Sequence, residues 1–142
     1  MALNVLVVDD SAVMRAIVIK TLHLSGVALG QIYEAKDGEE ALRVLDENWV
    51  DLALIDINMP VLDGMDMIDK VRQNPETSDL SIIVVSTESS ETRIENVQRK
   101  GVAFVHKPFT PETLRQAILR ATGVIDERQD SKSPVSGSGF DF

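Results

Sequence analysis

The sequence predicts an α/β fold in which five strands and five helices alternate and the strands form one doubly wound parallel sheet. Two observations lead to this prediction. Short segments rich in valine, isoleucine and leucine alternate with segments of helical spacing, which is the order of a sheet with helices on both faces. Three of the short segments are also almost continuously apolar, as strands buried on both faces of a parallel sheet are.

The predicted strands are short, and each is followed by a predicted helix. They cover residues 3–8, 31–35, 51–55, 80–85 and 102–105. The second is mixed in composition, which favours a place at the edge of the sheet. The first helix, over 11–24, is expected to present one stripe of side chains: Met14, Ile17, Val18, Thr21 and Leu22.

The helix boundaries carry capping and stop signals, which are acidic or hydroxyl residues at the start and Gly or Pro near the end. These signals are Asp37 with Glu40, Asp63 before Gly64, Asn74-Pro75, Thr110-Pro111 and Gly123. The fourth helix, over 89–100, has the weakest pattern because only Ile94 and Val97 are apolar.

Composition limits the class of protein. The chain has 142 residues, of which 44% are hydrophobic, and this suits one domain with a substantial core. The absence of cysteine excludes disulfides, thiolate metal sites and a cysteine nucleophile. A net charge of -9 argues against direct binding of nucleic acid. No membrane span or signal peptide is evident, so we expect a cytoplasmic protein with no membrane partner.

The composition changes near the end of the chain. We expect one domain over 1–122 and a flexible tail or linker over 123–142, because serine, glycine and scattered charge replace the apolar periodicity there. The final residues, Phe140-Asp141-Phe142, are interpreted as a frayed terminus or a trimmed linker rather than a docking peptide.

Chemically active side chains follow four of the predicted strands. Asp9-Asp10 follow the first strand, Asp56 the third, Ser86-Thr87 the fourth and His106-Lys107-Pro108 the fifth. In open parallel sheets, ligands bind beyond the carboxyl ends of the strands. We therefore expect three carboxylates, a hydroxyl and an amine to converge at one edge.

This group of residue types suits phosphoryl transfer. Three neighbouring carboxylates repel one another unless a cation compensates, and Mg²⁺ is the expected cofactor because it accepts few protein ligands and keeps waters for a phosphate. Lys107 would supply a positive charge for a phosphoryl oxygen, and Ser86 a hydrogen bond. Asp56 lies in an apolar context and is the natural nucleophile, since a carboxylate can form an acyl phosphate.

Four motifs in this order resemble the receiver domain of two-component response regulators, and within it the single-domain chemotaxis regulators. They are VVDDS at 7–11, IDINMP at 55–60 with Asp63-Gly64, VST at 85–87 and KPF at 107–109. The resemblance covers about residues 3–122. It implies a flavodoxin-like sheet of strand order 2-1-3-4-5, and a signalling switch rather than an enzyme with an external substrate.

The resemblance also implies roles for single residues. Asp56 would accept phosphate from a histidine kinase. Asp10 and Asp56 would bind Mg²⁺ through their side chains, Asn58 through its backbone carbonyl, and Asp9 through water. Lys107 would pair with the phosphoryl group, and its peptide bond to Pro108 would be cis.

The same resemblance assigns the response to phosphorylation. Ser86 would move toward the phosphate and draw Phe104 inward, where the chemotaxis regulators carry a tyrosine. A downstream protein would then bind the surface formed by the fourth helix, the fifth strand and the fifth helix. Asn58 and Glu88 would position the water that removes the phosphate, although Glu88 could instead be a solvated acid that the helix dipole favours.

Two other functions stay open at this point. A phosphatase of the haloacid-dehalogenase type also uses an aspartate nucleophile and Mg²⁺, but takes that nucleophile from the first strand and has a second aspartate two residues later, where this chain has Asn58. A flavodoxin-like FMN carrier should have a first loop rich in glycine and hydroxyl residues, and Asp9-Asp10 would repel the phosphate.

Several conspicuous residues are interpreted as structural. His23 is expected at the surface, and His106 in packing or at the surface. The ring of Trp49 is expected to cover the edge of the core. Met67 is placed in the core and Met59 at the surface.

Overall fold

The computed structural model describes residues 2–57, 59 and 61–123. Within them, five strands and five helices alternate as predicted. All strand pairs are parallel and the sheet has the order β2-β1-β3-β4-β5. The strands are β1 (Leu3–Val8), β2 (Leu29–Ala35), β3 (Leu52–Ile55), β4 (Ser81–Ser86) and β5 (Ala103–His106). The flavodoxin-like fold and its strand order are thus confirmed.

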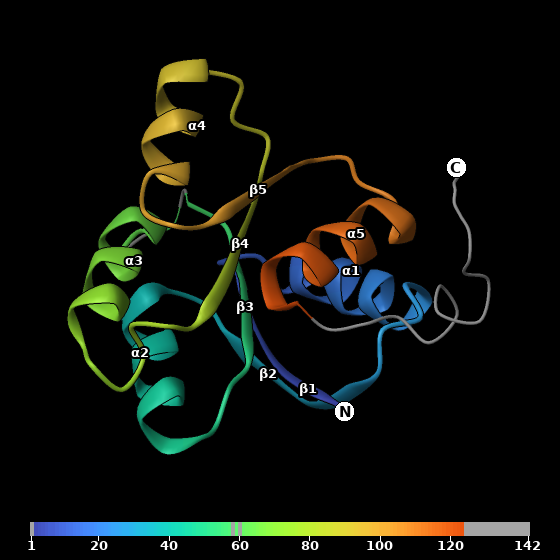
Figure 1. Ribbon diagram of the computed structural model, residues 1–142, viewed down its shortest axis with the longest axis horizontal. Helices are drawn as coiled ribbons and strands as arrows, with labels where there is room; N and C mark the ends of the chain where they lie inside the picture. Colours follow the sequence, from blue (N-terminus) through green and yellow to red (C-terminus); the bar gives the residue numbers. More distant parts are fainter. Residues whose placement is uncertain (1, 58, 60, 124–142) are drawn as a thin grey trace.

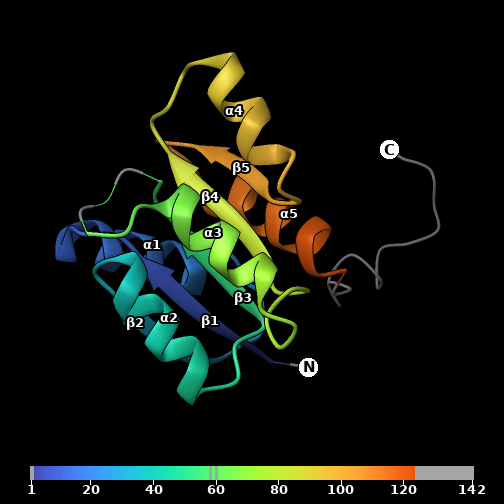
Figure 2. The same cartoon turned by 90° about the vertical axis from the view of Figure 1, so that its left-hand side faces the viewer.

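Helices cover both faces of the sheet (Figure 1). They are α1 (Ala12–Leu24), α2 (Gly38–Glu47), α3 (Gly64–Gln73), α4 (Glu91–Gln98) and α5 (Pro111–Thr122). Figures 1 and 2 show α1 and α5 on one face and the other three helices on the opposite face. Each face has its own apolar cluster, and β1, β3 and β4 contribute alternate residues to both.

Every helix begins at a side chain that accepts a hydrogen bond from the backbone N–H three residues later. These N-caps are Ser11, Asp37, Asp63, Ser90 and Thr110. Such caps satisfy backbone donors that a helix start leaves without partners. At the other end of α5, Gly123 has φ 72, a left-handed conformation that favours glycine.

The structure corrects three burial expectations. Ile17 is 46% exposed, because α1 buries only the narrower stripe of Val18 and Leu22. Met59, expected at the surface, is buried in the apolar cluster that also contains Met67 and Ile68 of α3. Trp49, expected to cover the core edge, is 75% exposed because its indole turns outward to a carboxylate.

Arg72 on α3 ties together segments that are distant in sequence. Its guanidinium donates to four backbone carbonyls, those of Ser78, Leu80, Lys100 and Gly101, at 2.7 to 3.1 Å. Burial lowers the pKa of Arg72 from its ordinary value, although the charge of Asp79 acts in the opposite direction. Lys100 also forms an ion pair with Asp69 of α3 at 2.5 Å.

Candidate functional site

Three carboxylates meet at the carboxyl ends of the two central strands. Asp9 and Asp10 follow β1, and Asp56 follows β3. One oxygen from each lies within 4.8 Å of the others. Asp9 is buried, Asp56 is half-buried and Asp10 is exposed, so the cluster reaches from the sheet edge into solvent.

The backbone at this edge is fixed by the sheet itself. The parallel ladder continues one residue beyond the strands: Asp9 N donates to the Ala35 carbonyl at 3.1 Å and Asp56 N to the Val8 carbonyl at 3.0 Å. The N–H of Lys107 likewise donates to the carbonyl of Ser86 at 2.9 Å. The side chains therefore project from positions that the neighbouring strands hold, which is what a preorganised site requires.

Lys107 brings the positive charge that the sequence predicted for this edge. Its Nζ lies 3.4 Å from Oδ2 of Asp9, and both side chains are largely buried. One ammonium against three carboxylates leaves the cluster negative. This donor set of hard oxygens fits a divalent cation such as Mg²⁺. The peptide bond between Lys107 and Pro108 is cis.

Arg15 holds the backbone of Asp9 in place, and this role was not predicted from the sequence. Its Nη1 donates to the backbone carbonyl of Asp9 at 2.6 Å, and its Nε bonds Glu34 of β2 at 2.9 Å. The N–H of Ser11 donates to Oδ1 of Asp9 at 2.9 Å. The available signal was a basic residue one turn into the helix that follows Asp9-Asp10, but that position is also common for a solvated arginine.

The segment after Asp56 is packed closely against α3. A Cβ on Gly64 would lie 2.7 Å from the Asp56 carbonyl oxygen and 2.6 Å from Cα of Ile57. The N–H of Gly64 also donates to the carbonyl of Ile57 at 3.1 Å. Only glycine fits this approach. Val61 in the same segment has φ 67, which is strained for a β-branched residue. Asn58, expected to bind metal and orient water, lies outside the described residues.

The residues after β4 form a local network. Ser86 is buried, and its Oγ accepts from the N–H of Glu88 at 3.1 Å. The Glu88 carboxylate accepts from the N–H of Ser90 at 3.1 Å and forms an ion pair with Arg93 at 3.3 Å. The backbone of Glu88 is thus bonded to Ser86, while its carboxylate is engaged at the start of α4.

Phe104 and His106 lie on β5 beside α4. Phe104 is half-buried, and its ring meets the exposed His106 ring edge-on, with 4.9 Å between centroids. In the sheet register, Phe104 pairs with Val84 and His106 pairs with Ser86. His106 and His23 are both at the surface, as expected, and Met67 is in the core.

Comparison with known proteins identifies this arrangement. Residues 5–119 match the response regulator receiver domain. The chain belongs to this family. The chemotaxis protein CheY1 of Helicobacter pylori is 36% identical over 126 residues, which are 87% of this chain and 100% of that protein. The CheY homolog of Campylobacter jejuni is 36% identical and covers 85% of this chain and 93% of its own.

Solved receiver structures agree in fold. The structure of the chemotaxis protein CheY4 of Vibrio cholerae has a TM-score of 0.75 at 32% identity and covers 85% of this chain and 99% of its own. A response regulator receiver protein of Pseudomonas putida has a TM-score of 0.73 at 30% identity, over 84% and 98% of the two chains. The family match gives no support to a haloacid-dehalogenase phosphatase. None of the helices in the described residues is long and apolar enough to cross a membrane.

Proposed function

We propose that this receiver is a phosphorylation-activated switch in a two-component system of the chemotaxis type, and that Asp56 accepts phosphate from a histidine kinase. The observation that carries the proposal is the convergence of Asp9, Asp10 and Asp56 within 4.8 Å, beside the Lys107 ammonium. Similarity to chemotaxis proteins over nearly their full length supports the chemotaxis setting.

The residues present have the chemistry for this step. An oxygen of the Asp56 carboxylate attacks the phosphorus of the kinase phosphohistidine, the phosphorus–nitrogen bond breaks, and the imidazole keeps the electron pair and takes up a proton. Asp10 and Asp56 would hold Mg²⁺, with Asp9 acting through water and Asn58 through its carbonyl. When bound, Mg²⁺ would offset the charge of the phosphoryl oxygens. Lys107 would exchange its contact with Asp9 for one with the phosphoryl group.

Residues between Asp56 and the face made of α4, β5 and α5 would transmit the effect of phosphorylation to that face. The Ser86 hydroxyl would donate a hydrogen bond to the phosphoryl group. As Ser86 moved toward this group, its Oγ would lose the hydrogen bond that it accepts from the N–H of Glu88, which lies just before α4. Phe104 is half-buried between the sheet and α4, so a rearrangement of this segment would change its packing. The downstream protein would therefore bind the face made of α4, β5 and α5.

The decisive experiment uses a small phosphodonor. Incubation with acetyl phosphate and Mg²⁺ should add one phosphoryl group, detected by intact mass, and EDTA should prevent it. Asp56→Asn should not label. Asp63→Asn is the matched control, because it changes a neighbouring aspartate that caps α3, and it should label normally. Equal labelling of Asp56→Asn and the unaltered protein would contradict the proposal.

A further inference from the structure

A groove lies at the end of the sheet opposite to the phosphorylation site. It runs between the segment that joins α2 to β3 and the segment that joins α3 to β4, and its volume is about 720 Å³. That is within the range of about 300–1,000 Å³ typical of ligand pockets. β3 separates the groove from Asp56, because the groove is at the amino end of this strand and Asp56 follows its carboxyl end. The groove takes no part in the function proposed above.

Trp49 lies exposed in this groove and is held in place. The indole Nε1 donates to Oδ1 of Asp51 at 3.0 Å, and the Trp49 carbonyl accepts from Asn4 at 3.2 Å. Asn4 N in turn donates to Oδ2 of Asp51 at 2.9 Å, which fixes the carboxylate. An aromatic ring that is 75% exposed yet fixed by its polar group loses little conformational freedom when a partner packs on it.

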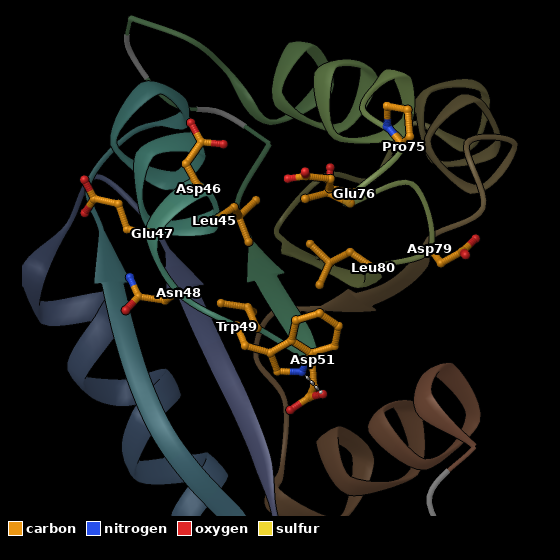
Figure 3. A pocket seen from close by; sticks show the side chains of 12 residues that line it. Leu45, Asp46, Glu47, Asn48, Trp49, Asp51, Pro75, Glu76, Asp79 and Leu80 are labelled. Atoms are coloured by element: carbon orange, nitrogen blue, oxygen red, sulfur yellow. Dashed lines mark hydrogen bonds between the residues drawn. The ribbon is translucent and has the colours of Figure 1, made fainter.

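The charged residues that line the groove all have the same sign, and Arg72, which interacts with Asp79, lies outside the lining. Of the twelve residues that line the groove, five are acidic and none is basic. Asp51 is engaged with Trp49, whereas Asp46 and Glu47 lie on one side of the groove and Glu76 and Asp79 on the other (Figure 3). Leu80 lies between them, near the indole. The surface is therefore an apolar and aromatic floor between two acidic rims.

We propose that this groove docks a basic, arginine-bearing segment of a partner protein, independently of phosphorylation. A guanidinium can stack on an indole face while its N–H groups reach carboxylates on either side. Charge complementarity also selects this occupant over a second copy of the chain, whose net charge is -9.

The test uses a fluorescein-labelled peptide in which arginine alternates with glycine and serine. The same peptide with citrulline in place of arginine is its control, because citrulline has nearly the same shape without the charge. The chain has one tryptophan, so a change in its emission on binding reports from the groove itself. Peptide anisotropy gives the affinity. We expect binding of the arginine peptide, and the same affinity for Asp56→Asn.

Two matched double variants separate docking in the groove from general attraction to an acidic protein. Asp46→Asn with Glu76→Gln should weaken binding about threefold to tenfold, as the loss of two exposed ion pairs implies. Glu95→Gln with Glu112→Gln removes the same charge from α4 and α5 and should have much less effect. Trp49→Ala should weaken binding about threefold or more, and Trp49→Phe should recover part of the loss.

Several results would overturn the proposal. These are no binding of the arginine peptide, equal binding of the citrulline peptide, or equal weakening by the two double variants. Self-association of the chain that Trp49→Ala abolishes would assign the groove to a second copy instead. Because the peptide assay needs neither Mg²⁺ nor a phosphodonor, its failure leaves the proposed switch function intact, and failure of Asp56 labelling leaves the groove result intact.

Discussion

The Nζ of Lys107 lies 3.4 Å from Oδ2 of Asp9, so this ammonium pairs with the most buried carboxylate of the cluster. We expect Lys107→Met to lower the melting temperature in EDTA, because Asp9 then loses its partner among three carboxylates. Mg²⁺ should restore more stability to this variant than to the unaltered protein. Thermal melts over a Mg²⁺ series measure both effects.

Lys100→Met is the control for that experiment. It breaks another ion pair, between Lys100 and Asp69, far from the carboxylate cluster. Its melting temperature should respond to Mg²⁺ as the unaltered protein does. If the two lysine variants respond alike, Lys107 has no special role in compensating the cluster.

Removal of Asp10 should have opposite effects with and without metal. Asp10→Ala takes one charge from the cluster and should raise the melting temperature in EDTA, while it abolishes the stabilisation by Mg²⁺. Glu47→Ala, which removes an exposed carboxylate at the other end of the sheet, should show neither effect. A lower melting temperature of Asp10→Ala in EDTA would mean that Asp10 is chiefly a structural cap.

The lifetime of the phosphorylated form should depend on Glu88 and Asn58. We expect Glu88→Leu and Asn58→Lys to slow phosphate release after the donor is removed, since both side chains can orient the attacking water. Glu88 also bonds Ser90 and Arg93, so Glu88→Leu should lower the melting temperature as well. A fall in melting temperature with unchanged release would leave Glu88 only a helix-terminus charge.

Gly64 should be intolerant of a side chain. Gly64→Ala places a methyl group 2.7 Å from the Asp56 carbonyl oxygen, and we expect a loss of about 1–3 kcal/mol in unfolding free energy. Phosphorylation should also slow, because the Asp56 backbone must shift. Asp63→Ala removes the neighbouring cap and should cost about 1 kcal/mol without slowing phosphorylation. Equal rates in the two variants would argue against this coupling.

Replacing Val61 with asparagine should raise the unfolding free energy. Its φ of 67 is unfavourable for a β-branched side chain, whereas asparagine adopts this conformation more readily. We expect Val61→Asn to add about 1 kcal/mol to the unfolding free energy. Val13, an exposed valine on α1, provides the control, since Val13→Asn should not stabilise. Denaturant unfolding measures both.

The sequence predicts the sheet and the meeting of the three carboxylates at its carboxyl edge, because both depend on local residue patterns. Apolar runs define the strands, and the residue after each run must lie at the carboxyl edge of a parallel sheet. The residue pattern therefore predicts that Asp9, Asp10 and Asp56 lie together, and in the structure one oxygen of each lies within 4.8 Å of the others. The division into a domain over 1–122 and a tail stays a prediction, since residues 124–142 lie outside the described residues.

Contacts to backbone carbonyls and the burial of single side chains were not predictable in this way. Arg15 and Arg72 donate to backbone carbonyl oxygens. Every residue has such a carbonyl, so the residue types do not show which one an arginine will contact. Ile17 has the correct helical spacing but lies on the outer flank of its stripe. The Trp49 ring is largely apolar and could pack in the core, but its hydrogen bond to Asp51 holds it at the surface.

The four carbonyl contacts of Arg72 have a mechanical consequence for α4. Two of them, to Lys100 and Gly101, hold the residues just after the end of this helix against α3, and the Lys100–Asp69 ion pair reinforces the attachment. The other end of α4 is held through Glu88, Ser90 and Arg93, next to the Ser86 hydroxyl. The attachment of the amino end therefore lies beside Ser86, and we expect a change in the hydrogen bonding of Ser86 to displace this end of α4 more than the end at Gly101.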